Sequence, residues 1–276
     1  LENHGVVIGA EDLFAAFCIF ETLDYCARLQ IKASTIGTPH GLQDRHYEIY
    51  RQKAFAEFEE YDETVRTSEE LAARRDICSL ISRAYDNQLF MSQQGSFSCR
   101  LSDGSILITP YAKDRKLLQP GDLVKITAGG KCERGKVPSR SVRLILALYH
   151  RYPEIQSVIT ASPPNIMAFA VTEREFDARL IPESYIMLRT VQKYPFGATF
   201  MQPAKFAEEL SPSNPVAIIE NDCVITTGNS LLNAFDRLEV MEYSAKSVIA
   251  TDHIGRIVAI NDEAIKDIEK AFHLNP

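Results

Sequence analysis

An internal repeat limits the folds open to this chain more than any other feature of its sequence. Residues 2–31 align without a gap with residues 220–249. The shared residues include Glu-Asn, Ala-Phe, Glu and Tyr (Glu2-Asn3 and Glu220-Asn221, Ala16-Phe17 and Ala234-Phe235, Glu21 and Glu239, Tyr25 and Tyr243). Because the copies lie about one domain length apart, we expect residues 1–37 to be the C-terminal remnant of a first domain whose front part is absent. Residues 38–65 would be a linker helix, and residues 66–276 a complete second domain.

The composition is that of a globular protein. Of the 276 residues, 45% are hydrophobic and 24% are charged, which excludes disordered and low-complexity classes. The net charge of −7 opposes contact with phosphate backbones, so we expect no nucleic-acid partner. No apolar run approaches the roughly 20 residues of a membrane span, and the six cysteines show no disulfide or zinc spacing. The sequence therefore predicts a cytoplasmic protein without a membrane partner.

The hydrophobic pattern alternates between helical and strand-like periods. Helices are predicted over 11–33, 46–61, 67–86, 141–152, 164–171, 231–249 and 262–272, and strands over 95–100, 105–109, 122–127, 157–160, 216–219 and 224–226. The pair Asp103-Gly104 is typical of a hairpin turn between two of these strands. Mixed strands and helices without strict alternation indicate an α/β or α+β fold built in layers.

Several short motifs follow one another in a specific order. The segments are GSFSCR at Gly95–Arg100, ILITP at Ile106–Pro110, VPS at Val137–Ser139, PEIQSVI at Pro153–Ile159 and LENHG at Leu1–Gly5. They resemble G-N-x-S-x-R, I-L-I-T-P, K-P-S, P-D-x-x-A-V-V and L-x-N-H-G of the class II aldolase/adducin family, which includes fuculose-phosphate and rhamnulose-phosphate aldolases. The resemblance implies a layered α/β/α sandwich around a mostly antiparallel sheet.

The resemblance also implies a chemistry and shows where this chain departs from it. The family holds a zinc-type metal with an H-x-H pair and the His of N-H-G, and a Glu moves the proton in an aldehyde-lyase reaction. This chain has Thr160 and Ser162 at the H-x-H pair, Asp222 at the N-H-G histidine, and Ser141 at the Glu. Two hydroxyls and one carboxylate do not replace three imidazoles around zinc. The complete domain is therefore predicted to be degenerate, non-catalytic and without a cofactor of its own.

The first copy of the repeat keeps the ligand that the second has lost, because His4 aligns with Asp222. The resemblance implies that His4 is a metal ligand of the missing first domain, which would hold zinc or a similar divalent metal. Residues 66–276 would then serve assembly or complete that neighbouring active site. A homo-oligomer or self-association of the tandem domains is the expected partnership. Tyr185 lies near the sequence position at which some family members carry a tyrosine that acts as an acid across a subunit boundary, although a packing role is the alternative.

Two other functions stay open. The second domain could have kept the family's pocket as a metal-independent binding module for a small anion or phosphorylated sugar. Its binding residues would be three serines and two arginines that the family's fold brings together (Ser96, Ser98, Ser139, Arg100 and Arg140). Guanidinium groups bind phosphate through paired hydrogen bonds, although Arg140 in a solvated loop is the alternative. The third possibility is a different enzyme rebuilt around Asp222, Ser162 and Cys223.

Overall fold

The computed structural model describes residues 1–63, 65–252 and 254–274. Its helices are α1 (Leu13–Ile36), α2 (Asp44–Arg51), α3 (Ser68–Asp86), α4 (Val142–Arg151), α5 (Pro164–Ala170), α6 (Pro182–Leu188), α7 (Ala198–Met201), α8 (Pro203–Phe206), α9 (Leu231–Thr251) and α10 (Asp262–Ala271), with a 3₁₀ turn at Pro120–Asp122. Its strands are β1 (Glu60–Tyr61), β2 (Ser96–Arg100), β3 (Ile106–Ile108), β4 (Val124–Ile126), β5 (Cys132–Glu133), β6 (Ser157–Ala161), β7 (Gln192–Tyr194), β8 (Val216–Ile219) and β9 (Cys223–Gly228). In the described ranges, no helix combines the length and the apolar run needed to span a bilayer.

The strands form one mixed sheet in the order β1-β5-β4-β3-β2-β6-β9-β8-β7. The inner pairs are antiparallel, but both edge pairs, β1–β5 and β7–β8, are parallel. The parallel edge pairs correct the expectation of a mostly antiparallel sheet to that of a mixed one. The reason is connectivity: β7 reaches β8 through α7 and α8, and parallel neighbours need such a crossover. Hairpin connections such as Asp103-Gly104 between β2 and β3 give antiparallel pairs instead.

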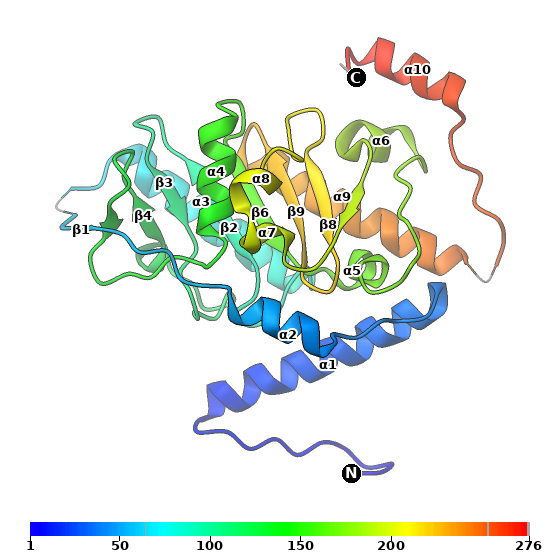
Figure 1. The fold of residues 1–276 in the computed structure, drawn as a ribbon, viewed down its shortest axis with the longest axis horizontal. Coiled ribbons are helices and arrows are strands. Elements are labelled where there is room, and N and C mark those ends of the chain that lie inside the picture. Colours follow the sequence, from blue (N-terminus) through cyan, green and yellow to red (C-terminus); the bar gives the residue numbers. More distant parts are fainter. Residues whose placement is uncertain (64, 253, 275–276) are drawn as a thin grey trace.

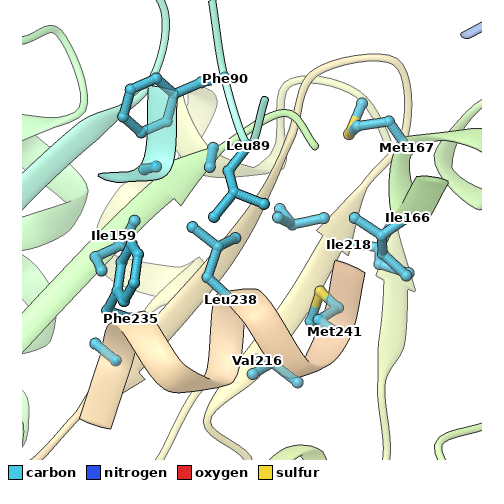
Figure 2. Close-up of a cluster of buried hydrophobic side chains, with 14 of the residues drawn as sticks. Leu89, Phe90, Ile159, Ile166, Met167, Val216, Ile218, Phe235, Leu238 and Met241 are labelled. Atoms are coloured by element: carbon cyan, nitrogen blue, oxygen red, sulfur yellow. The ribbon is translucent and has the colours of Figure 1, made fainter. Parts of the chain in front are cut away.

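Helices cover both faces of the sheet, as the predicted α/β/α layering requires (Figure 1). On one face, Phe235, Leu238 and Met241 of α9 pack toward Ile159 and Ile218 (Figure 2). On the other face of the same strands, a second buried cluster packs α4, α8 and the segment that follows α8 against the sheet (including Val142, Leu144, Val158, Phe206 and Ile225). The alternation of Val158 and Ile159 between the two clusters follows from the two-residue period of a strand.

Most predicted helices and strands are present, but the helix predicted over 46–61 is not. Only α2 (Asp44–Arg51) forms, and Glu60–Tyr61 instead adds β1 to the edge of the sheet. Within α2 the His46 ring accepts from the backbone N–H of Gln43 at 2.8 Å, which satisfies a free donor at the start of the helix. The segment predicted to be a linker helix is thus a short helix followed by an extended chain.

The two copies of the repeat share a turn and the start of a helix, but residues 5–10 form no strand where the second copy forms β9, and the surroundings of the copies differ. Asn3 and Asn221 both adopt left-handed backbone angles, with φ of 50° and 54°. The helices begin at matching residues, and Asp12 and Ser230 cap them in the same way through an N–H three residues on. However, Phe17 is 46% exposed whereas its counterpart Phe235 is 0% exposed. Helix α1 lies at the periphery of the molecule (Figure 1), where Ala33 and Ile36 at its end are buried.

Candidate functional site

A cavity of about 590 Å³ opens where the ends of β6 and β9 meet the start of α4. Its walls include Thr160, Ser162, Asp222 and the loop at Ser139. Residues 42–55, which we call the cover segment, close another side. The cover segment contains α2 and contributes five lining side chains (Leu42, His46, Tyr47, Tyr50 and Lys53). The cavity therefore lies between the sheet and the stretch of chain that precedes it in sequence.

A chain of hydroxyl groups runs along the base of the cavity. Ser96 and Thr160 are paired across β2 and β6, and their Oγ and Oγ1 atoms lie 2.8 Å apart. Ser96 Oγ lies 2.7 Å from Ser141 Oγ, which lies 3.0 Å from Ser139 Oγ. Ser96 itself is buried just behind the cavity wall. Hydroxyls both donate and accept, so this chain adapts to a polar ligand but supplies no strong base.

Arg140 stands at the wall of the cavity among aromatic rings. Its guanidinium carbon lies 5.1 Å from the ring centre of Tyr50, 5.5 Å from that of Tyr111 and 5.9 Å from that of Phe55. It also donates a hydrogen bond to the Tyr50 hydroxyl. Cation–π contacts of this kind hold a guanidinium in place while leaving its remaining N–H donors for a ligand. The alternative of a freely solvated loop charge does not describe this side chain.

Lys53 brings a second cation to the cavity. Its side chain is 17% exposed, and Nζ lies 3.9 Å from Asp222 Oδ1. The same nitrogen lies 4.8 Å from the ring centre of Phe200 and 5.7 Å from that of Tyr50. The left-handed turn at Asn221, whose side-chain amide donates to the His40 carbonyl at 2.7 Å, fixes the backbone next to Asp222.

Arg115 lines the cavity but has its donors occupied. It donates to the carbonyls of Gly95, Pro110 and Lys113 at 2.7–3.2 Å. Burial lowers the pKa of Arg115 to about 10, and the nearby Asp114 carboxylate opposes this shift. Gly95, which supplies one of these carbonyls, also packs closely against the backbone of Thr160. Its φ is +77°, and a Cβ there would lie 2.9 Å from the Thr160 carbonyl oxygen, so a larger residue would not fit. Arg115 therefore shapes the cavity wall rather than offering free donors.

Cys223 is poorly suited to act as a nucleophile. Burial raises its thiol pKa well above the ordinary value, the Asp222 carboxylate raises it further, and Lys53 only partly offsets both effects. Since the thiolate is the reactive form, these surroundings suppress reactivity. The raised thiol pKa thus disfavours a thiol enzyme rebuilt around Asp222, Ser162 and Cys223.

The donor groups in the cavity do not fit zinc. Ser162 Oγ is directed to the Asp222 carbonyl at 3.3 Å, Thr160 Oγ1 is bonded to Ser96, and Lys53 places a positive charge beside the Asp222 carboxylate. Across residues 1–63, 65–252 and 254–274, no group of three His, Cys, Asp or Glu side chains is placed to hold a metal ion. Zinc sites use three or four imidazole, thiolate or carboxylate ligands, and of Thr160, Ser162 and Asp222 only Asp222 is of such a type. These three residues therefore do not fit zinc.

The structure brings some of the predicted site residues together and separates others. Ser139, Arg140, Ser141, Thr160, Ser162 and Asp222 line the cavity, with Ser96 directly behind them. Ser98 and Arg100 do not, which corrects their expected convergence. Ser98 is buried against the Tyr149 hydroxyl at 2.8 Å, and Arg100 donates to the Tyr149 carbonyl and stacks 4.8 Å from its ring. The strand period puts both on the face of Ser96, but further along β2 and beneath α4.

Two further predicted residues lie away from the cavity. The Tyr185 hydroxyl, on α6, donates to Glu269 of α10 at 2.7 Å. Burial raises the pKa of Tyr185, and the hydrogen bond to Glu269 adds to this shift. His4 is exposed in a turn at residues 2–4. The role of Tyr185 across a subunit boundary and that of His4 as a ligand remain predictions.

The sequence did not identify Lys53, Tyr50 or Phe200 as site residues. The one available signal is the unusual density of aromatic residues over 46–61, a stretch that overlaps the cover segment (Tyr47, Tyr50, Phe55, Phe58 and Tyr61). The sequence predicts a helix for that stretch. Two of its rings instead lie beside the cations of the cavity, Tyr50 next to Lys53 and Arg140, and Phe55 next to Arg140.

Comparison with known proteins gives one consistent result. Residues 75–249 match the family described as Class II Aldolase and Adducin N-terminal domain. The chain is 26% identical over 207 residues to 3-oxo-tetronate 4-phosphate decarboxylase of Haemophilus influenzae, covering 71% of this chain and 96% of that protein. It is 27% identical over 174 residues to L-fuculose phosphate aldolase of Methanococcus vannielii, covering 62% and 90%. The fold resembles the crystal structure of YgbL from Escherichia coli, with a TM-score of 0.66 at 23% identity over 72% of this chain and 98% of that one.

Proposed function

Because this chain belongs to the class II aldolase and adducin N-terminal domain family, we propose that its cavity binds a small phosphorylated sugar without carrying out metal-dependent aldehyde-lyase chemistry. One observation carries the proposal. The positions that resemble the metal ligands of the family hold Thr160, Ser162 and Asp222, and the charge beside them is the Lys53 ammonium. The cavity keeps cationic and hydroxyl groups for an anionic ligand but lacks the residues that would activate one.

Arg140 and the hydroxyl chain are the proposed phosphate site. The guanidinium donates to Tyr50, and its planar fork has further N–H donors that suit phosphate oxygens. Ser139 and Ser141 lie in the same loop and offer hydroxyl donors next to it. The curated relatives named above have phosphorylated substrates in their names, which supports a phosphate-bearing ligand here.

Titration calorimetry with inorganic phosphate on the full chain tests the binding. We expect Arg140→Met to weaken phosphate binding about tenfold, the loss of one charge-assisted interaction. Arg151→Met is the matched control, because Arg151 is an exposed arginine on α4 that lies outside the cavity.

Cleavage of L-fuculose phosphate with added zinc tests the absence of lyase activity. We expect none. Measurable cleavage that depends on zinc would contradict the proposal, as would phosphate binding that is unaffected by Arg140→Met.

We also propose that residues 1–37 belong to a second, metal-bearing class II aldolase-like unit in the assembled protein. The support is the contrast in burial: Val6 is 54% exposed whereas its counterpart Val224 is 0% exposed, and Phe17 and Phe235 differ in the same sense. Residues 2–31 share the sequence pattern of β9–α9, but residues 5–10 form no strand, and Leu13, Phe14 and Phe17 of α1 are exposed. This segment therefore has an apolar face suited to another sheet of this family. That sheet would come from a tandem domain or from a partner copy. His4 would then have the same position relative to that second sheet as Asp222 has relative to the sheet described above.

Zinc analysis of the protein isolated from its natural source tests this second proposal. We expect His4→Ala to remove zinc and Asp222→Ala to leave the zinc content unchanged. Zinc that survives His4→Ala, or its absence from the unmodified protein, would contradict the proposal.

A further inference from the structure

Resting on the proposed phosphosugar site, we propose that Lys53 and Asp222 together bind two neighbouring hydroxyl groups of the ligand in place of a metal. Nothing in the sequence links these two residues, since one precedes the first long helix of the domain and the other lies between β8 and β9. The structure brings Lys53 Nζ to 3.9 Å from Asp222 Oδ1 at the wall of the cavity.

The Lys53 ammonium keeps its donors for a ligand. An ammonium has three N–H donors, and among the described residues none of them forms a hydrogen bond with a protein atom. The distance to Asp222 exceeds the roughly 2.7–3.2 Å of an N–H···O hydrogen bond, so the pair is held by charge alone. The Phe200 ring, 4.8 Å from Nζ, holds the ammonium in position without using a donor.

Asp222 supplies the complementary acceptor. Its backbone is fixed by the turn at Asn221, and its side chain lies at the cavity wall with an exposed fraction of 19%. A carboxylate accepts hydrogen bonds and an ammonium donates them. A pair of neighbouring hydroxyl groups meets both requirements, because one hydroxyl oxygen accepts from Lys53 while the other hydroxyl donates to Asp222.

The charge balance of the cavity decides whether the ligand presents hydroxyl groups or a second anionic group to Lys53 and Asp222. Lys53 and Asp222 neutralise each other, and Arg115 already donates to three backbone carbonyls. Arg140 remains as the cation available to a phosphate. A ligand carboxylate near Lys53 would face Asp222, and two like charges at that distance repel. The cavity therefore favours a ligand with one phosphate and a neutral polyol over a phosphorylated sugar acid.

Three small probes separate these alternatives in calorimetric titrations of the full chain. Glycerol 3-phosphate carries a phosphate and two neighbouring hydroxyls, and propyl phosphate carries only the phosphate. In 3-phosphoglycerate a carboxylate replaces the terminal hydroxymethyl group, which leaves one hydroxyl. We expect the unmodified chain to bind glycerol 3-phosphate about tenfold more tightly than propyl phosphate, as one or two added hydrogen bonds allow. We expect 3-phosphoglycerate to bind no more tightly than propyl phosphate.

Lys53→Met and Asp222→Asn test the two residues separately. Each is expected to abolish the preference for glycerol 3-phosphate over propyl phosphate. The unpaired charge that each variant leaves shifts both affinities together, to weaker binding in Lys53→Met and to tighter binding in Asp222→Asn. Lys205→Met, at an exposed lysine of α8 outside the cavity, is the control, and equal melting temperatures show that each variant folds.

The outcomes separate this inference from the proposal on which it rests. If propyl phosphate binds but the hydroxyls add nothing, or if the preference survives both variants, the role of Lys53 and Asp222 is wrong and the phosphate site stands. Tighter binding of 3-phosphoglycerate would also overturn the inference. If none of the probes and no inorganic phosphate binds, both proposals fail.

Discussion

The hydroxyl oxygens of Ser96 and Thr160 lie 2.8 Å apart where β2 pairs with β6. This contact ties Thr160, which resembles the first metal ligand of the family in position, to a buried serine. Ser141, which the resemblance aligns with the proton-moving Glu, completes the same network at 2.7 Å from Ser96. The three hydroxyl groups thus satisfy one another by hydrogen bonding.

Rebuilding the ligand set should restore a metal site. Thr160 and Ser162 lie two residues apart at the end of β6, and Ser162 contacts the backbone of Asp222 at 3.3 Å. We expect the variant with Thr160→His, Ser162→His, Asp222→His and Lys53→Ala to bind about one zinc per chain, as three imidazoles and water suffice for zinc. Elemental analysis after dialysis measures this.

The matched control for the zinc variant keeps Lys53. Its ammonium, now 3.9 Å from the Asp222 carboxylate, would face the metal and weaken zinc binding. A quadruple variant that folds but holds no zinc would show that the three positions do not converge as the structure indicates.

The local elements were predictable because local signals specify them. Thr67 was expected to start a helix, and its hydroxyl accepts from the Glu70 N–H at 3.1 Å as the cap of α3. Asp103-Gly104 turns the chain between β2 and β3 as expected. Motif order also located Thr160 at the cavity.

The cover segment could not be predicted in the same way. Lys53 and Asp222 meet only because residues 42–55 fold over the ends of the strands. No periodicity encodes a contact between two such distant residues. Similarly, the pattern put Ser96 and Ser98 on one face of β2, but only the packing of Tyr149 from α4 shows that Ser98 is covered.

A buried ion network should make Arg74 important for stability. Arg74 is fully buried and bonds to Glu70 at 2.7 Å and Glu133 at 3.1 Å. Burial alone would raise the pKa of Glu70, but hydrogen bonds from Lys125 and Arg74 outweigh it and lower that pKa. Arg74→Met removes one buried partner from each carboxylate, although Lys125 still bonds to Glu70 and Lys136 to Glu133. We therefore expect a loss of about 1.5–3 kcal/mol in the free energy of unfolding, the value of hydrogen bonds to charged groups.

Urea denaturation measures this loss, with Arg75→Met as the control because Arg75 is exposed on the same helix. The control should change the free energy of unfolding by less than about 0.5 kcal/mol. Equal effects of the two substitutions would contradict a structural role for the network.

Cys223 should resist alkylation. Burial and the neighbouring Asp222 raise its thiol pKa, whereas Cys26 is an exposed thiol on α1. With iodoacetamide at pH 8, we expect Cys26 to be labelled first, and Asp222→Asn to speed the labelling of Cys223 by removing one cause of the shift. Mass spectrometry of the labelled peptides gives both rates. Labelling of Cys223 as fast as Cys26 in the unmodified chain would reopen the case for a thiol enzyme.

Glu242 should make stability fall as the pH rises. Its carboxylate, buried beneath the start of α5, accepts from the N–H groups of Asn165 and Ile166 at 2.9–3.0 Å. Burial raises the pKa of Glu242 to about 7, although these hydrogen bonds oppose the shift. Because the folded-state pKa exceeds the unfolded-state value, the contribution is complete below about pH 4.5 and is lost as the pH rises to about 7.

Comparison of the unmodified chain with Glu242→Gln isolates this contribution, because the variant side chain does not titrate. The stability advantage of the unmodified chain should be larger at pH 5 than at pH 8, by up to about 3 kcal/mol. Glu263→Gln, at an exposed residue of α10, should show no such pH dependence. If the advantage of the unmodified chain instead grows with pH, then hydrogen bonds from Asn165 and Ile166 outweigh burial and Glu242 is ionised in the folded protein.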